Sequence, residues 1–155
     1  MAQKPPQKVS QKLAQQRSGC PINMSVELLG DRWSLLVIRD VMFADRHTFA
    51  ELHTGSEEGI ATNILTDRLK RLVAAGVLRR TEVPGSRNKV RYDLTERGID
   101  LVPALTAIGG WGAKHLKVDA DLCRVVQDLQ VGGLDAEEAL MQQLRDRDLK
   151  RTGTG

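Results

Sequence analysis

The stretch Ile60–Arg91 constrains this chain most, because a helical pattern in it is followed at once by the pattern of a short hairpin. It reads IATNILTDRLKRLVAAGVLRRTEVPGSRNKVR. Its acidic residues are Asp67 and Glu82, and its basic residues are Arg68, Lys70, Arg71, Arg79, Arg80, Arg87, Lys89 and Arg91. A basic excess carried on one helix and one hairpin is typical of a surface that reads nucleic acid.

The first half of the stretch has the apolar spacing of an amphipathic helix that stops at Gly76, a residue suited to the C′ position. The face expected to be buried holds Ile64, Leu65, Leu69, Leu72 and Val73. The face expected to point outward holds Asn63, Thr66, Asp67 and Lys70. Asn can read adenine edges, and Lys can read guanine or hold phosphate, which suits a helix in the major groove. An ordinary solvated helix face has the same composition, so this pattern alone leaves both interpretations open.

The second half of the stretch alternates with period two on either side of Pro84-Gly85-Ser86, which predicts two strands joined by a turn. The tip of this hairpin carries Arg87, Asn88 and Lys89. A basic tip beside a polar helix is what contact with phosphates and the minor groove requires. The alternative is a merely soluble hairpin, and the shared charge of tip and helix disfavours it.

Helical patterns precede the stretch. One begins at Cys20-Pro21, repeats apolar residues at Ile22, Val26 and Leu29, and ends at Gly30. A second begins near Asp31–Ser34, and its predicted apolar stripe comprises Trp33, Leu36, Val37 and Val41, widened by Leu35, Ile38 and Met42. This second helix is so apolar that we expect it to be central to the core.

A short helix is predicted at Thr48–Leu52, where Thr48 and Glu51 have the spacing of a capping box and Phe49 and Leu52 face inward. A turn over His53–Gly59 leads to the longer helix. Short helix, turn, longer helix and hairpin is the order of a winged helix-turn-helix. The predicted fold class is mainly α with a small β-hairpin wing (α+β), with flanking dimerisation helices.

After the hairpin, Thr95 is the expected cap of another helix, along which an apolar stripe runs. The stripe comprises Ile99, Val102, Leu105, Ile108 and Trp111 or Gly112. Pro103 lies within it and is expected to kink or split the helix. With the first helix, this one is the candidate dimer surface, and the alternative is that it packs within its own subunit.

The remaining segment predicts two more helices, separated by Gly132-Gly133 and followed by a frayed RTGTG end. The predicted organisation is a flexible basic tail over residues 1–18, a winged helix-turn-helix domain over 19–117, and a C-terminal helical extension over 118–155. The extension could widen a dimer interface, fold back on the core or recruit a partner. The tail could instead act as a basic arm on DNA.

Composition narrows the class of protein. The 155 residues carry a net charge of +3, and charge is uneven, with a basic start and middle and an acidic segment after Lys117. No apolar run approaches the roughly 20 residues that span a bilayer, and the start lacks a secretory h-region. The two cysteines, Cys20 and Cys123, form neither a disulfide framework nor a zinc pattern. The cytoplasm is therefore the expected location.

Several motifs in order resemble one known family. They are Cys20-Pro21, Leu29-Gly30-Asp31-Arg32-Trp33-Ser34, Phe49-x-x-Leu52, Gly59-Ile60, Leu65-Thr66-x-x-Leu69, Gly76-Val77-Leu78, Val90-Arg91-Tyr92-x-Leu94-Thr95-x-x-Gly98, Leu101-Val102-Pro103 and Trp111-Gly112. Together they resemble the HxlR-type winged helix-turn-helix regulators, relatives of the MarR-type regulators, from Cys20 to about Leu116. Family members often have Ser where this chain has Ala61, which leaves the start of the probe helix open unless Thr62 supplies the cap.

The resemblance implies a homodimeric bacterial transcription factor on a two-fold symmetric operator, with the probe helix over Ala61–Lys70 and the wing at Arg87–Lys89. The predicted DNA-binding residues are Thr62, Asn63, Thr66, Asp67, Arg68, Lys70, Arg71, Arg87, Asn88 and Lys89. The rival interpretation is a protein-interaction module that docks through the acidic C-terminal helices. A further alternative is a regulator gated by a small ligand in a pocket between the dimer helices, and composition does not decide between these alternatives.

Cys20 is a candidate redox or electrophile sensor, because some members of the resembled family sense oxidants through a cysteine at this place. A thiol at a helix N-terminus can have a lowered pKa. A small packed thiol without redox function is the common alternative. His47, His53 and His115 lack metal-ligand spacing and are expected to be surface or cap residues. No nucleophile elbow or dinucleotide fingerprint is present, so neither catalysis nor a cofactor is expected.

Overall fold

The computed structural model describes residues 17–153 of the chain. Most of the predicted tail (residues 1–16) and the last two residues of the predicted frayed end (154–155) lie outside the described residues. The described residues divide into two compact units, 17–32 and 33–153.

The described part of the first unit is built around α2 (Pro21–Leu29), which begins where the proline predicted. Pro21 occupies the first turn, where a missing N–H costs nothing. The Gly30 N–H closes the helix on the Val26 carbonyl at 2.7 Å. Arg17 pairs with Glu27 at 3.0 Å on the same unit. None of the residues of α2 is buried.

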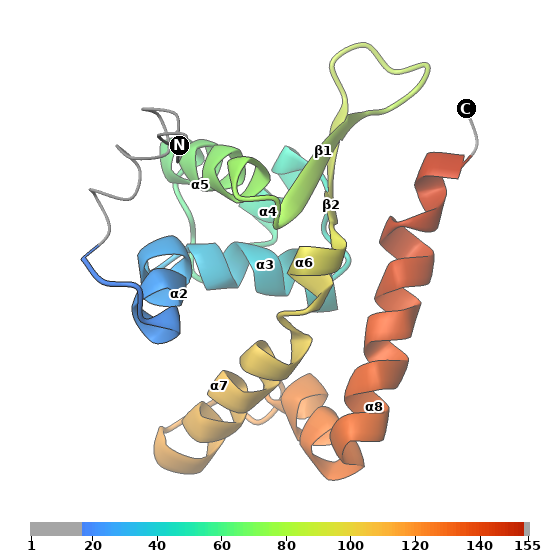
Figure 1. The fold of residues 1–155 in the computed structure, drawn as a ribbon. Coiled ribbons are helices and arrows are strands. Elements are labelled where there is room, and N and C mark those ends of the chain that lie inside the picture. The colour runs from blue at the N-terminus through green and yellow to red at the C-terminus, as the bar shows by residue number, and fades with distance from the viewer. Residues whose placement is uncertain (1–16, 154–155) are drawn as a thin grey trace, which may run out of the picture. The chain divides into compact units, whose positions relative to one another are not determined.

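The second unit is mainly helical and carries one antiparallel two-stranded hairpin, which confirms the predicted fold class (Figure 1). Its elements are α3 (Ser34–Phe43), α4 (Phe49–Thr54), α5 (Thr62–Ala74), β1 (Leu78–Glu82), β2 (Val90–Leu94), α6 (Glu96–Ile99), α7 (Val102–His115), α8 (Arg124–Asp148) and the 3-10 helix η1 (Lys150–Gly153). The register pairs Leu78 with Leu94 and Glu82 with Val90.

The core of this unit lies where α3, α4, α5 and the base of the hairpin meet. Its fully buried apolar side chains include Ile38, Val41, Leu52, Leu65, Leu69, Leu72, Leu78, Leu94, Ile99 and Val102. The predicted stripe of α3 is partly wrong: Val37, Ile38, Val41 and Met42 are buried, whereas Trp33, Leu35 and Leu36 are only half-buried. The helix therefore turns the face that carries Ile38 and Met42 toward the core. Hydrophobicity alone could not tell this face from the one that carries Leu35 and Leu36.

Local signals fix the ends of α4 and α5. The Glu51 N–H donates to Thr48 Oγ1 at 3.3 Å and the Thr48 N–H donates to Glu51 Oε2 at 3.0 Å, so the predicted capping box is present. At the end of α5, Gly76 has φ +72°, and the Val77 N–H donates to the Leu72 carbonyl at 2.9 Å. This is a Schellman closure, which needs a residue that tolerates positive φ.

The start of α5 has no side-chain cap. Ala61 is the N-cap residue with extended backbone, and the helix begins at Thr62. Thr62 therefore does not replace the missing Ser cap, and the first N–H groups of α5 remain exposed to solvent or a ligand.

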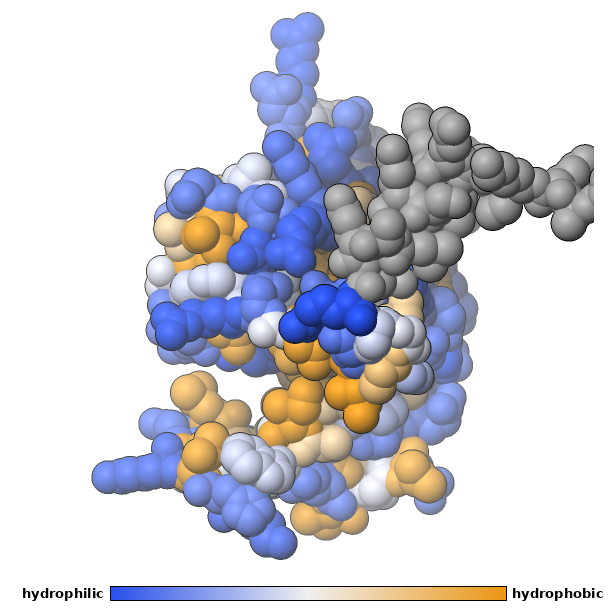
Figure 2. Space-filling view, turned by 60° about the vertical axis from the view of Figure 1, so that its left-hand side comes forward, coloured by the Kyte–Doolittle hydropathy of each residue, from blue (hydrophilic) through white to orange (hydrophobic). Residues whose placement is uncertain are grey.

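Pro103 splits the helix after the wing into two. Thr95 caps α6 through a bond from the Gly98 N–H to Thr95 Oγ1 at 3.2 Å, and α7 starts afresh with Pro103 in its first turn. The first half of the predicted stripe is buried, at Ile99, Val102 and Leu105, but Ile108 is 55% and Trp111 is 60% exposed. Apolar side chains are visible at the surface of the molecule as orange areas among hydrophilic blue ones (Figure 2). The outer end of α7 is thus uncovered by its own unit.

The C-terminal extension folds back on the core. Its helix α8 breaks at Gly133, where φ +62° and ψ −148° are non-helical, as the Gly132-Gly133 pair predicted. The first half packs against α7, and the second half runs back toward the base of the hairpin (Figure 1). Leu129, Met141 and Leu144 of α8 are buried, as is Cys123 before it. No helix in residues 17–153 is long and apolar enough to cross a membrane.

Candidate nucleic-acid interface

The outer face of α5 is polar and exposed along its whole length. Leu65, Leu69 and Leu72 anchor the inner face, each at most 1% exposed. The exposed residues of the outer face are Thr62, Asn63, Thr66, Asp67, Lys70 and Arg71. This is the orientation that the apolar spacing predicted, and it places amide, hydroxyl, carboxylate and ammonium groups on one ridge.

Thr66 and Asp67 on this ridge already bond within the chain. Thr66 Oγ1 donates to the Thr62 carbonyl at 2.8 Å, so its oxygen can still accept a bond from outside. Asp67 pairs with Arg68, whose side chain is only 18% exposed. The half-buried position of Arg68 means that only part of its guanidinium can reach an outside partner.

The turn that leads into α5 is held from α3. Arg39 makes two bonds to the Glu58 carboxylate, at 2.7 and 2.9 Å, and a third to Asp40 at 2.9 Å. The hydrogen bonds from Arg39 keep the pKa of Glu58 below its usual value. A fork of this kind fixes direction as well as distance, so it orients the start of α5 relative to the core.

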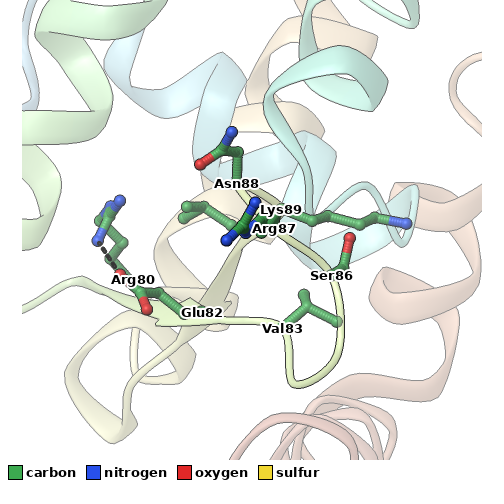
Figure 3. A pocket seen from close by; sticks show the side chains of 8 residues that line it. Arg80, Glu82, Val83, Ser86, Arg87, Asn88 and Lys89 are labelled. Atoms are coloured by element: carbon green, nitrogen blue, oxygen red, sulfur yellow. Dashed lines mark ion pairs between the residues drawn. The ribbon is translucent and has the colours of Figure 1, made fainter.

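The tip of the wing is a separate basic feature. A hollow of about 430 Å³ lies within the loop that joins β1 to β2, and its lining includes Arg80, Arg87 and Lys89 beside the single acid Glu82. Figure 3 shows these side chains around the loop, with Arg80 and Glu82 paired at 4.0 Å. Asn88 has φ +72°, a conformation that Asn tolerates, which helps the loop to turn with Arg87, Asn88 and Lys89 all exposed.

Two of the basic residues in the stretch do not belong to this surface. Arg91 Nε donates to Asp93 Oδ1 at 2.7 Å, and Arg79 Nη2 donates to the backbone carbonyl of Asp148 at 2.7 Å. Both arginines therefore point toward acids at the base of the wing. The count of basic residues in the sequence overstated the charge that the hairpin presents outward.

His47 corrects a second expectation. It was expected at the surface or in a cap, but its side chain is 2% exposed and lies between β2 and the residues before α4. Its Nδ1 lies 2.9 Å from the Tyr92 carbonyl and 3.0 Å from Asp93 Oδ1, and its Nε2 lies 2.8 Å from Asp45 Oδ1. Every one of these neighbours is an acceptor, so the geometry favours a ring that donates from both nitrogens, which is the imidazolium form.

Charge pairing sets the protonation of this cluster. Burial would lower the pKa of His47, but the bonds to Asp93, Asp45 and the Tyr92 carbonyl raise it above the usual value. Burial would likewise raise the pKa of Asp93, and the contacts with His47 and Arg91 bring it below the usual value. The cluster is thus a set of mutually neutralising charges at the base of the wing.

The same cluster includes three atoms with a spacing that a metal ion could use. His47, Asp93 and Asp148 each offer one ligand atom within 4.8 Å of the others. Arg91 already pairs with Asp93 at 2.7 Å, Arg147 pairs with Asp148 at 2.6 Å, and both ring nitrogens of His47 already face oxygen atoms of the protein. The donor set fits an ion-pair network and does not fit a metal site.

Comparison with known proteins identifies the family. The HxlR-like helix-turn-helix family matches residues 28–120, more than half of the chain. The chain belongs to this family. An uncharacterised HTH-type transcriptional regulator of Synechocystis sp. is 34% identical over 107 residues, 69% of this chain and 78% of the relative. A similarly described regulator of Mycobacterium bovis is 33% identical over 104 residues, and the match spans 64% of that protein's length.

A solved structure agrees with this assignment. The oxidised form of the redox regulator HypR superposes with a TM-score of 0.55 at 28% identity, covering 64% of this chain and 100% of that one. The HxlR-type chain is therefore a DNA-binding transcriptional regulator with a winged-helix fold. Its named relatives are transcriptional regulators, a class of protein that is not catalytic.

Cys20 of this HxlR-type chain is exposed and lies immediately before α2. The backbone N–H groups of Asn23 and Ile22 lower the pKa of its thiol, which is the effect expected of a helix N-terminus. Cys123 is buried.

The residues that sequence reasoning missed are those of the cluster at the base of the wing: Asp45, His47, Asp93, Arg147 and Asp148. They come from three separate parts of the chain, and the bonds between them join residues up to 102 positions apart. The spacing of residues within one helix or hairpin gives no information about contacts between residues so far apart in the sequence.

Proposed function

We propose that this regulator binds DNA as a homodimer and reads an inverted-repeat operator through α5 and the wing. In this proposal Asn63, Thr66 and Lys70 reach base edges, and Thr62 and Asp67 complete the exposed ridge. Arg68, Arg71, Arg87, Asn88 and Lys89 contact phosphates and sugars. The observation that carries the proposal is the polar ridge of α5, exposed along its length and followed in the chain by an exposed basic wing tip.

In this proposal the basic residues supply affinity for any duplex, and the residues that reach base edges supply sequence specificity. Phosphate contacts position a protein on any duplex, and contacts with base edges distinguish one sequence from another. In a symmetric dimer, two copies of α5 would enter successive major grooves about 34 Å apart. We place this activity in the cytoplasm, with the nucleoid.

The test is a selection of bound duplexes from a random library, with the protein reduced and at moderate salt. We expect an enriched inverted repeat whose half-sites are about one helical turn apart. Binding to all sequences with equal affinity would contradict sequence reading, and an enriched single half-site would contradict the dimer.

The rival function, docking of a protein partner through the acidic helices, has less support. Asp148 is fully buried, and Glu138 is paired with Arg145 at 3.1 Å, so two of the acids in the extension serve the chain itself. Salt distinguishes the two functions: duplex affinity that falls steeply with salt supports the regulator, because bound phosphates release counterions.

We further propose that Cys20 responds to oxidants or electrophiles. Its exposed thiol and lowered pKa favour the reactive thiolate, and the similar HypR is a redox regulator. Diamide should release the wild-type protein from its operator and should leave Cys20→Ser bound, while Cys123→Ser should respond like the wild type. Equal release of the wild type and Cys20→Ser would remove the sensing role. A small-ligand signal remains the alternative.

A further inference from the structure

The end of α8 lies beyond the family match, which stops at residue 120, and yet it contacts the wing. Asp148 is 0% exposed, and its Oδ2 accepts the Leu94 N–H of β2 at 3.0 Å. Its carbonyl accepts Arg79 Nη2 of β1 at 2.7 Å. One residue of the extension therefore holds both strands of the hairpin at their base.

Arg147 ties the same point to the core. Its Nε donates to Asp148 Oδ1 at 2.6 Å, and its Nη2 donates to the Val41 carbonyl at the end of α3 at 2.9 Å. Its Nη1 also pairs with Asp45 at 3.2 Å. The guanidinium thus connects α3, the residues before α4 and the carboxylate that holds β2.

The outer edge of β2 shows what this connection achieves. The Tyr92 N–H donates to the His47 carbonyl at 2.7 Å, and the Tyr92 carbonyl is bonded to the His47 ring. Two positions further on, the Leu94 N–H is bonded to Asp148. The edge of the strand is therefore satisfied by a loop residue and a carboxylate where a third strand would otherwise pair.

A two-stranded hairpin is marginally stable by itself, so its direction depends on what supports its base. Arg87 and Lys89 lie at the far end of this hairpin, where a small rotation at the base becomes a larger displacement. We infer that Arg147 and Asp148 form a brace that sets the wing on the core and so positions Arg87 and Lys89 for phosphate contact. This inference rests on the proposed DNA-binding function.

The first test needs no DNA. Hydrogen exchange of the free protein would be compared among the wild type, Asp148→Ala, Asp148→Asn and the control Asp146→Ala, which removes an exposed acid two residues away. We expect the Leu94 amide to exchange about tenfold faster in Asp148→Ala, with less change in Asp148→Asn, because Asn can still accept the N–H. Wild-type exchange at β2 in the folded Asp148→Ala protein would overturn the brace.

The second test is a double-mutant cycle on the selected operator. Asp148→Ala should make affinity for the operator depend less steeply on salt, as in the variant that lacks both Arg87 and Lys89. The slope of log affinity against log salt concentration should change by at most about two units per protomer. Adding Asp148→Ala to that wing-neutral variant should change nothing further, since the contacts it positions are already gone. Asp146→Ala should match the wild type.

The outcomes separate the two proposals. Additive losses in the cycle, or an unchanged slope in Asp148→Ala, would overturn the positioning role while leaving DNA binding intact. If Asp148→Ala fails to fold, Asp148→Asn provides the same cycle with the Leu94 bond retained and the pairing with Arg147 weakened. Failure of the wild type to bind any duplex would overturn the proposed function, and the positioning role with it, whatever the exchange experiment shows.

Discussion

Asn63 lies in the first turn of α5 and Lys70 lies two turns further along the same exposed ridge. The amide of Asn63 can donate and accept at once, which matches an adenine edge in the major groove. Lys70 presents three donors and no acceptor, so it can hold a phosphate or a guanine equally well. The two side chains therefore differ in how much sequence information they can carry.

Replacing Asn63 by Ala should change which sequences are bound. We expect the preference at one base position of each half-site to weaken by about 1–3 kcal/mol, because a bidentate base contact is lost. The selection described above measures this directly. Arg71→Ala is the control and should weaken binding to all duplexes alike; the same uniform loss in Asn63→Ala would argue against base reading.

His47 gives the fold a dependence on pH. Its pKa is raised in the folded state, so the stability it contributes is complete below about pH 6.5 and is lost as the pH rises through the higher folded value. The pKa of Asp93 is lowered, so its contribution is present above about pH 3.8 and is lost as the pH falls through the lower folded value. Stability should therefore be greatest in the mildly acidic range between the two.

The urea midpoint of the wild type should accordingly fall when the pH rises from 6 to 8. His47→Gln removes the titrating ring, so its midpoint should be lower at pH 6 and nearly flat over that range. His53→Gln, which alters a half-buried histidine outside the cluster, should follow the wild type. A midpoint that falls equally in His47→Gln and the wild type would assign the pH dependence to other groups.

Among the elements around the proposed interface, α5 starts differently from α4 and α6. Ala61 has the extended backbone of an N-cap but offers no side-chain acceptor, whereas Thr48 and Thr95 cap α4 and α6 with their hydroxyls. The first N–H groups of the proposed probe helix thus have neither an intrahelical partner nor a side-chain cap, and a helix N-terminus of this kind attracts phosphate.

Ala61→Ser should stabilise the free protein by about 1 kcal/mol, because the new hydroxyl can accept an N–H of the first turn. Thermal unfolding measures the gain. Ala74→Ser, at the other end of the same helix, supplies no cap and should be neutral or slightly destabilising. A melting temperature unchanged by Ala61→Ser would mean that the start of α5 is already satisfied by other means.

The ends of elements were predictable from sequence because their causes are local. The pair Thr48 and Glu51, the stop at Gly76, the split at Pro103 and the break at Gly133 each act within a few residues. The rotation of α3 was not predictable, since apolar residues lie on more than one face of the helix and tertiary packing decides which of them are buried. The outward face of α5 was predictable, because only one of its faces is apolar.

At the scale of the whole molecule, the C-terminal extension returns to the winged-helix domain and contacts it at several elements. Arg145 pairs with Glu96 of α6 at 2.7 Å, and Arg147 and Asp148 reach α3 and both strands. Sequence alone left three roles open for this segment. Which acid meets which arginine across such separations depends on the completed fold, so the buried cluster could not be foreseen.

The exposed apolar end of α7 is where the proposed dimer should form. Trp111→Glu should yield a monomer with the same fold and should lower affinity for the full operator at least about tenfold, because the two half-sites would no longer be bound together. Sedimentation and operator titration measure the two effects. Lys114→Ala, an exposed change on the same helix, should remain dimeric, and a dimeric Trp111→Glu protein would place the interface elsewhere.

The bond between Leu94 and Asp148 also sets an order of events during synthesis. The two residues are 54 positions apart, so at 5–20 residues per second Asp148 is added roughly 3–11 s after Leu94. Throughout that interval a nascent chain contains the residues of α5 and of both wing strands but lacks the acceptor for the Leu94 amide. A ribosome that stalls before Asp148 would hold a chain that can form α5 but cannot complete the base of its wing.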